Sequence, residues 1–118
     1  MTKNIYYHNP RCSKSRQGLT ILAEQGIDFT TKEYLTEKLT SAELTELFLK
    51  LTGDPRKAIR TKEKIYEELG LKDKNIAPSE WVQILIEHPL LLERPILVTE
   101  KRTIIGRPPE NFLLNIDL

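Results

Sequence analysis

The change of hydrophobic period along the chain constrains the fold more than any other feature. Residues 4–8 (NIYYH) and 28–35 (DFTTKEYL) are rich in residues that favour strands, and residues 13–26 between them carry apolar side chains at helical spacing. A strand, a helix and a second strand within about thirty residues predict a βαβ unit. The chain therefore opens with strands that belong to one sheet.

The middle of the chain, approximately residues 40–92, is predicted to be helical. Residues 40–43 (TSAE) match a capping box, in which a threonine caps the helix and a glutamate follows three positions later. Residues 56–68 form a charged helical stretch, and residues 78–89 begin with a proline and carry a second apolar face. This region predicts a helical insertion.

After the insertion the period changes back to that of strands. Residues 96–99 (ILVT) and 102–105 (RTII) are short β-rich runs, which predict a hairpin, and a last helix is expected from Pro108 through Phe112 to Ile116. The fold class is therefore α/β, with a small mixed sheet flanked by helices. The chain length of 118 residues fits one domain over residues 1–118.

Composition and charge indicate which partners and which cellular compartment to expect for this protein. The 18 Lys and Arg residues nearly balance the 17 Asp and Glu residues, and a net charge of +1 gives no sign of a nucleic-acid partner. The start of the chain lacks an apolar secretory signal, and the most apolar stretch, residues 81–98, is interrupted by charges and prolines. We therefore expect a cytoplasmic protein without a membrane partner.

A single cysteine, Cys12, is the candidate reactive group. One cysteine excludes an internal disulfide and a multi-cysteine metal site, and no metal is expected. Cys12 falls between a strand and the first turn of a helix, where free amides and the helix dipole favour a thiolate. The alternative interpretation is that Cys12 is a small buried residue of the core. The reactive interpretation is favoured because three basic residues lie beside the thiol: Arg11, Lys14 and Arg16.

The spacing around Cys12 excludes two kinds of enzyme. Ser15 stands where a C-x-x-C redox pair would have its second thiol, so the chain is not a dithiol disulfide exchanger. Gly18 stands where a cysteine phosphatase of the C-x-x-x-x-x-R type needs its arginine. A reaction at Cys12 that transfers electrons must therefore use thiols from other molecules.

Three segments together resemble one family. YHNPRCSKSR (residues 7–16), ERPILV (93–98) and IGRPPE (105–110) are similar to segments of the glutaredoxin-dependent arsenate reductases, in the same order and at the same spacing. The resemblance covers nearly the whole chain. It implies a thioredoxin-like fold, with a mixed four-stranded sheet and the helical insertion between the second and third strands. It also implies a cis peptide bond before Pro95.

The resemblance assigns roles to particular residues. Cys12 corresponds to the cysteine that attacks arsenate, and His8 and Ser15 correspond to residues that assist the thiolate. Three arginines correspond to those that hold the oxyanion, a task that suits the bidentate geometry of guanidinium groups: Arg60, Arg94 and Arg107. The family uses glutathione as co-substrate and glutaredoxin as partner, so we expect both here, with no bound cofactor and a monomeric protein.

Several alternatives stay open at this point. The protein could be a general monothiol oxidoreductase that acts on glutathione mixed disulfides, a redox regulator that binds RNA polymerase, or an anion-binding protein without turnover. Arg60 lies in a charge run that is typical of a solvated helix face, and Arg56, one turn away, competes with it for the anion-binding role. His8 could be a hydrogen-bonded residue at a strand end, and His88 and Trp81 are expected to be structural.

Overall fold

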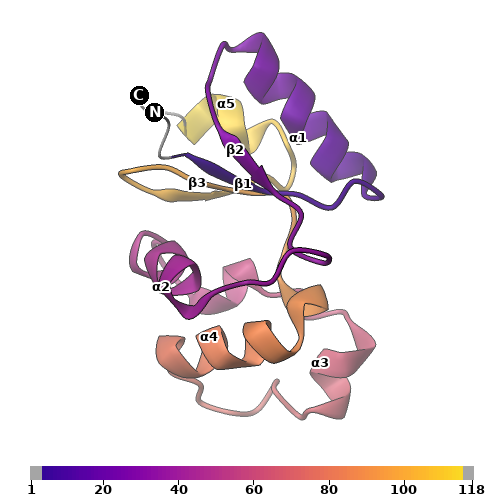
Figure 1. Cartoon of the computed structure of the whole chain (residues 1–118). Coiled ribbons are helices and arrows are strands. Elements are labelled where there is room, and N and C mark those ends of the chain that lie inside the picture. The colour runs from indigo at the N-terminus through magenta and orange to yellow at the C-terminus, as the bar shows by residue number, and fades with distance from the viewer. Residues whose placement is uncertain (1–3, 116–118) are drawn as a thin grey trace.

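The computed structural model describes residues 4–115 and is organised around a four-stranded mixed sheet in the order β2-β1-β3-β4 (Figure 1). β1 (Ile5–Tyr7) is parallel to β2 (Thr30–Lys32) and antiparallel to β3 (Ile96–Val98), which pairs antiparallel with β4 (Thr103–Ile105). The predicted mixed sheet, βαβ start and C-terminal hairpin are confirmed. Each strand is shorter than the run of sequence that predicted it.

Helices cover both faces of this sheet (Figure 1). α1 (Ser13–Glu24) and α5 (Asn111–Asn115) lie on one face, and the helices of the insertion lie on the other. Successive side chains of a strand point to opposite faces. Tyr6 accordingly packs in the cluster that contains residues of α1 and α5, whereas Tyr7 packs in the larger cluster that contains the insertion.

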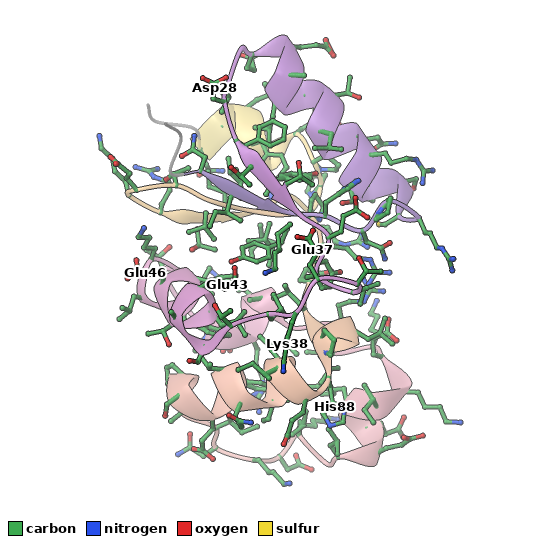
Figure 2. The ribbon with its side chains drawn as sticks, viewed as in Figure 1. Asp28, Glu37, Lys38, Glu43, Glu46 and His88 are labelled. Atoms are coloured by element: carbon green, nitrogen blue, oxygen red, sulfur yellow. The ribbon has the colours of Figure 1, made fainter. Side chains whose placement is uncertain are left out.

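The insertion contains three α-helices, α2 (Ser41–Leu49), α3 (Lys64–Glu68) and α4 (Pro78–Glu87), and two short 3-10 helices, Pro55–Ala58 and Pro89–Leu91. The predicted capping box at the start of α2 is confirmed, because the Glu43 amide donates to the Thr40 hydroxyl and the Thr40 amide donates to the Glu43 carboxylate at 2.7 Å. The Glu43 carboxylate also lies 3.1 Å from Lys32 Nζ of β2. Figure 2 shows Glu43 between α2 and the sheet, so one residue both caps the helix and ties the insertion to a strand.

The prediction of one helical stretch over residues 56–68 is wrong. The structure divides it into a short 3-10 helix, Pro55–Ala58, an extended residue at Ile59, a turn, and α3. Ile59 forms an isolated antiparallel bridge with Leu92, and the Arg60 amide donates to the Leu91 carbonyl at 2.7 Å. Pairing with a distant segment thus overrides local helix propensity here. As a result Arg60 lies beside the segment that leads into β3.

The strand β3 starts at a cis proline. The peptide bond Arg94–Pro95 is cis, as predicted, and Arg107–Pro108 is also cis, which the sequence analysis did not predict. The start of α1 lies close to this segment. A Cβ at Gly18 would collide with the Tyr6 hydroxyl and lie 3.2 Å from Pro95 Cγ, so only glycine allows this approach. The close approach packs the N-terminal half of α1 against Pro95, where β3 begins.

The helices of the described chain are short. α1 is the longest with 12 residues, and α5 ends at Asn115, so the predicted extension to Ile116 lies outside the described residues. Among residues 4–115, no helix is long and apolar enough to cross a membrane.

Candidate active site

Cys12 occupies the position that caps the N-terminus of α1. Its backbone is extended, its amide donates to the Asn9 carbonyl at 3.0 Å, and its side chain does not cap the helix. The thiol is partly exposed. It lies at the first turn of α1, where the backbone amides of Lys14 and Ser15 act on it. The strand-to-helix setting predicted for this cysteine is therefore the one observed.

The surroundings of Cys12 favour its ionised form. Partial burial by itself raises the pKa of the Cys12 thiol, but the Ser15 amide, the Arg94 guanidinium and the Lys14 amide together outweigh burial and lower the pKa below its usual value. Hydrogen bonds and a nearby positive charge stabilise the thiolate, and burial opposes it. More of the thiol is then present as the nucleophilic thiolate at neutral pH than in an ordinary cysteine.

His8 and Ser15 form a buried pair behind the thiol. The Ser15 Oγ accepts from the Asn9 amide at 3.0 Å and lies 2.6 Å from His8 Nδ1. Burial lowers the pKa of His8, and this effect exceeds the opposing influence of Glu33, so the ring is neutral at physiological pH. Since Oγ already accepts one hydrogen bond, its own hydrogen can be donated to Nδ1. The pair fixes the loop that carries Cys12, and Ser15 acts on the thiol through its backbone amide.

Arg94 is the arginine that lies beside the thiol. It acts on Cys12 both as a hydrogen-bond donor and as a positive charge. Its Nε and Nη1 atoms are buried, and they have no hydrogen-bond partner among the residues that the structure describes. Buried donors without a partner are costly and rare in folded proteins. Two such donors on a cation next to a thiolate are therefore well suited to an anionic ligand.

Tyr34, which the sequence analysis missed, also belongs to this environment. Its side chain is 1% exposed, and within residues 4–115 its hydroxyl has no hydrogen-bond partner. Burial raises the pKa of Tyr34 to about 12, although the nearby Arg94 guanidinium favours the phenolate. The hydroxyl therefore keeps its proton at neutral pH and can donate it. Its position in a predicted strand gave no signal of this role.

Arg60 and Arg107 meet at a second missed residue, Glu93. The Glu93 Oε1 atom lies 3.2 Å from Arg60 Nη1 and 3.1 Å from Arg107 Nε, and it also accepts from the backbone amide of Arg94 at 3.1 Å. A pocket of about 340 Å³ is lined by these three side chains and by two exposed neighbours, Thr61 and Lys62. The structure thus brings Arg60 and Arg107 together at Glu93, the residue that precedes Arg94 in the sequence.

The side chain of Arg56, the alternative to Arg60 for the anion-binding role, makes its contacts within the insertion. Its Nε donates to the Tyr66 hydroxyl at 3.1 Å, its Nη2 donates to the Leu71 and Lys74 carbonyls, and its guanidinium lies 5.3 Å from the centre of the Trp81 ring. These contacts hold the insertion together. The geometry favours Arg60 for the site.

The second histidine of the chain, His88, belongs to the insertion and not to the segment that carries Cys12. His88 follows α4, and its amide donates to the Ile84 carbonyl at 2.8 Å. Figure 2 shows it within the insertion. Across residues 4–115, no group of three or more His, Cys, Asp or Glu side chains is arranged to hold a metal ion. The site described here consists of a thiol, guanidinium groups, a carboxylate and a phenol.

This arrangement can perform one kind of chemistry. A thiolate is a good nucleophile, and guanidinium groups bind oxyanions and stabilise the charge that develops as an oxygen leaves. The nucleophile and an anion-binding guanidinium group lie side by side because β1, α1 and the segment before β3 meet at one end of the sheet. Cys12 is therefore positioned to attack the central atom of an anion, or the sulfur of a disulfide, held beside Arg94.

Comparisons with known proteins agree on one family. Residues 7–114 match the sequence pattern of the ArsC family. A protein of Escherichia coli K12, named "Uncharacterized protein YfgD", is 42% identical over 116 residues, which cover 96% of this chain and 97% of that protein. A protein of Neisseria meningitidis serogroup A named "Arsenate reductase" is 41% identical over 107 residues, which cover 90% of this chain and 92% of that one.

A solved structure shows the same fold. The structure described as "Arsenate reductase from Vibrio cholerae" superposes with a TM-score of 0.86, at 38% sequence identity, and covers 98% of each chain. A likeness over the whole of both chains confirms the predicted thioredoxin-like fold, including its helical insertion.

Proposed function

Because this chain belongs to the ArsC family, we propose that it is an arsenate reductase that uses Cys12 as its nucleophile. Relatives from Neisseria meningitidis and Vibrio cholerae that carry this name match nearly the whole chain. One observation carries the proposal. A thiol with a lowered pKa lies beside Arg94, whose two buried donors have no protein partner within residues 4–115.

In the first step the thiolate attacks arsenate. Arg94 holds the oxyanion through Nε and Nη1, and the N–H groups of Arg60 and Arg107 line the adjoining pocket. A thiolate and an oxyanion repel each other, so positive charge is needed to hold them together. The Cys12 sulfur forms a bond to arsenic, and an arsenic–oxygen bond breaks. The oxygen leaves as water after it takes up protons, and guanidinium groups stabilise the charge on it.

In the second step arsenic gains two electrons. Cys12 is the only cysteine, so the reducing thiols come from other molecules. A glutathione thiolate attacks the Cys12 sulfur, a sulfur–sulfur bond forms, and the electron pair of the sulfur–arsenic bond passes to arsenic, which leaves as arsenite. Glutaredoxin with a second glutathione then reduces the mixed disulfide and restores Cys12. Overall, arsenate and two glutathione molecules give arsenite, glutathione disulfide and water.

A second activity is favoured by one observation. Glu93 already accepts hydrogen bonds from both Arg60 and Arg107, which reduces the positive charge available to a substrate. Reduction of glutathione mixed disulfides needs the Cys12 thiolate and the amides of α1, but it does not need all three arginines. A general monothiol oxidoreductase is therefore the alternative function.

The two functions are separated by a coupled assay. NADPH consumption is measured with glutathione, glutathione reductase and glutaredoxin, once with arsenate and once with a glutathione mixed disulfide. For an arsenate reductase we expect arsenate-dependent turnover that is lost in Cys12→Ser and falls by about 100-fold or more in Arg94→Ala, the usual effect of removing a donor that stabilises developing charge. Turnover with the mixed disulfide alone would support the alternative and contradict the proposal.

A further inference from the structure

The carboxylate of Glu93 lies within the group of arginines assigned to the oxyanion. A single oxygen, Oε1, accepts from Arg60 Nη1, from Arg107 Nε and from the Arg94 amide, at 3.1–3.2 Å. The Glu93 side chain is 19% exposed, so solvent screens these interactions only in part. A negative charge is therefore built into the group of arginines itself.

Glu93 leaves part of each guanidinium available. Arg60 uses Nε for Glu63 and Nη1 for Glu93, and Arg107 uses Nε for Glu93. Other nitrogens of these side chains have no hydrogen-bond partner in the part of the chain that the structure describes. They are Arg60 Nη2, both terminal nitrogens of Arg107, and Nε and Nη1 of Arg94. An oxyanion can thus bind beside Glu93 without displacing it.

The same carboxylate has two opposite effects on such an anion. Its hydrogen bonds fix the orientation of two long side chains, so less conformational freedom is lost when an anion binds. Its charge repels the anion and offsets part of the attraction of the arginines. A glutamine would keep an oxygen that accepts the hydrogen bonds and would remove the charge, so it separates the two effects.

We propose that Glu93 sets the anion affinity of the site: it positions Arg60 and Arg107, and its charge limits the affinity for doubly charged tetrahedral oxyanions. The inference rests on the proposed function only in that the arginines bind an oxyanion. Glu93 acts through the arginines and is a positioning residue.

Sulfate is a suitable probe, because it is tetrahedral and doubly charged and does not accept electrons from thiols. Its dissociation constant is measured by calorimetry at constant ionic strength for the native protein, Glu93→Gln and Glu93→Ala. We expect Glu93→Gln to bind sulfate about tenfold more tightly, the effect of removing one nearby charge in partly screened surroundings. Glu93→Ala, which loses the positioning oxygen as well, should fall between the native protein and Glu93→Gln.

Glu63→Gln is the matched control. Glu63 lies 2.9 Å from Arg60 Nε, whereas Arg107 pairs through its Nε with Glu93, and the Glu63 side chain is 23% exposed. We expect its removal to change sulfate affinity clearly less than Glu93→Gln does. An equal gain in both variants would show a general charge effect and would overturn the assignment to Glu93.

The outcome is independent of arsenate turnover. If Glu93→Gln binds sulfate no more tightly than the native protein, the inference is wrong, even if arsenate is reduced. If it binds sulfate more tightly while the native protein shows no arsenate turnover, the inference stands and the arsenate reductase proposal fails. Melting temperatures measured for every variant exclude unfolding, and Glu93→Ala provides the second charge-removing variant.

Discussion

Replacing Arg94 with glutamine should raise the pKa of Cys12. The guanidinium of Arg94 stabilises the thiolate by hydrogen bonding and by its charge, whereas partial burial of the thiol works in the opposite direction. Glutamine removes the charge and keeps a polar side chain. The remaining stabilisation comes from the backbone amides of Ser15 and Lys14, which the substitution does not change.

The size of the shift follows from the contacts. A hydrogen bond to a charged group contributes about 1.5–3 kcal/mol, and the partly exposed thiol lies toward the lower end because water screens it. About 1.4 kcal/mol corresponds to a factor of ten in an equilibrium constant, so the fraction of Cys12 present as thiolate at neutral pH should fall by about tenfold in Arg94→Gln.

The assay is the pH dependence of Cys12 alkylation by iodoacetamide, which reports the thiolate because Cys12 is the only thiol. The midpoint of the rate profile should move to higher pH in Arg94→Gln. Arg11→Gln is the matched control, since Arg11 is next to Cys12 in sequence but its side chain is exposed, and its midpoint should move much less. A midpoint in Arg94→Gln equal to that of the native protein would refute the role assigned to Arg94.

Four further substitutions test the surroundings of the site. Ser15→Ala removes the acceptor of a buried backbone amide and should lower the free energy of unfolding in urea by about 1–3 kcal/mol. Gly18→Ala introduces a Cβ that collides with the Tyr6 hydroxyl and should cost about 1–3 kcal/mol. Its cost should be smaller in a Tyr6→Phe background, and an equal cost in both backgrounds would show that the collision is not the cause. Arg56→Ala should lower the melting temperature and keep most arsenate turnover, whereas Arg60→Ala should lower turnover with little change in melting temperature. The reverse pattern would exchange the roles of the two arginines.

Features that depend on neighbours in sequence were predictable. The capping box at Thr40 and the helix that begins after Cys12 were both identified from a few adjacent residues, because a cap or a first helical turn is made by local hydrogen bonds. The thiolate-favouring position of Cys12 follows from the same local geometry. The cis bond before Pro95 was expected from the family resemblance, and the structure has it.

The predicted helix over residues 56–68 shows where local reasoning fails. Its composition suits a helix, but the bridge between Ile59 and Leu92 holds the backbone extended. The same pairing turns Arg60 toward Glu93, 33 positions away in sequence. Arg56, four positions before Arg60, is instead held by the insertion. No pattern within this segment distinguishes the two arginines.

The sequence by itself determined the order of the elements, the helix caps and the placement of one thiol at a helix start, since each depends on interactions within a few residues. Only the tertiary structure decided which cations surround that thiol, and that Glu93 and Tyr34 belong with them. The physical reason is that charge and burial act through space. Arg94 reaches Cys12, and Glu93 joins Arg60 to Arg107, only after the sheet has brought segments far apart in the chain together.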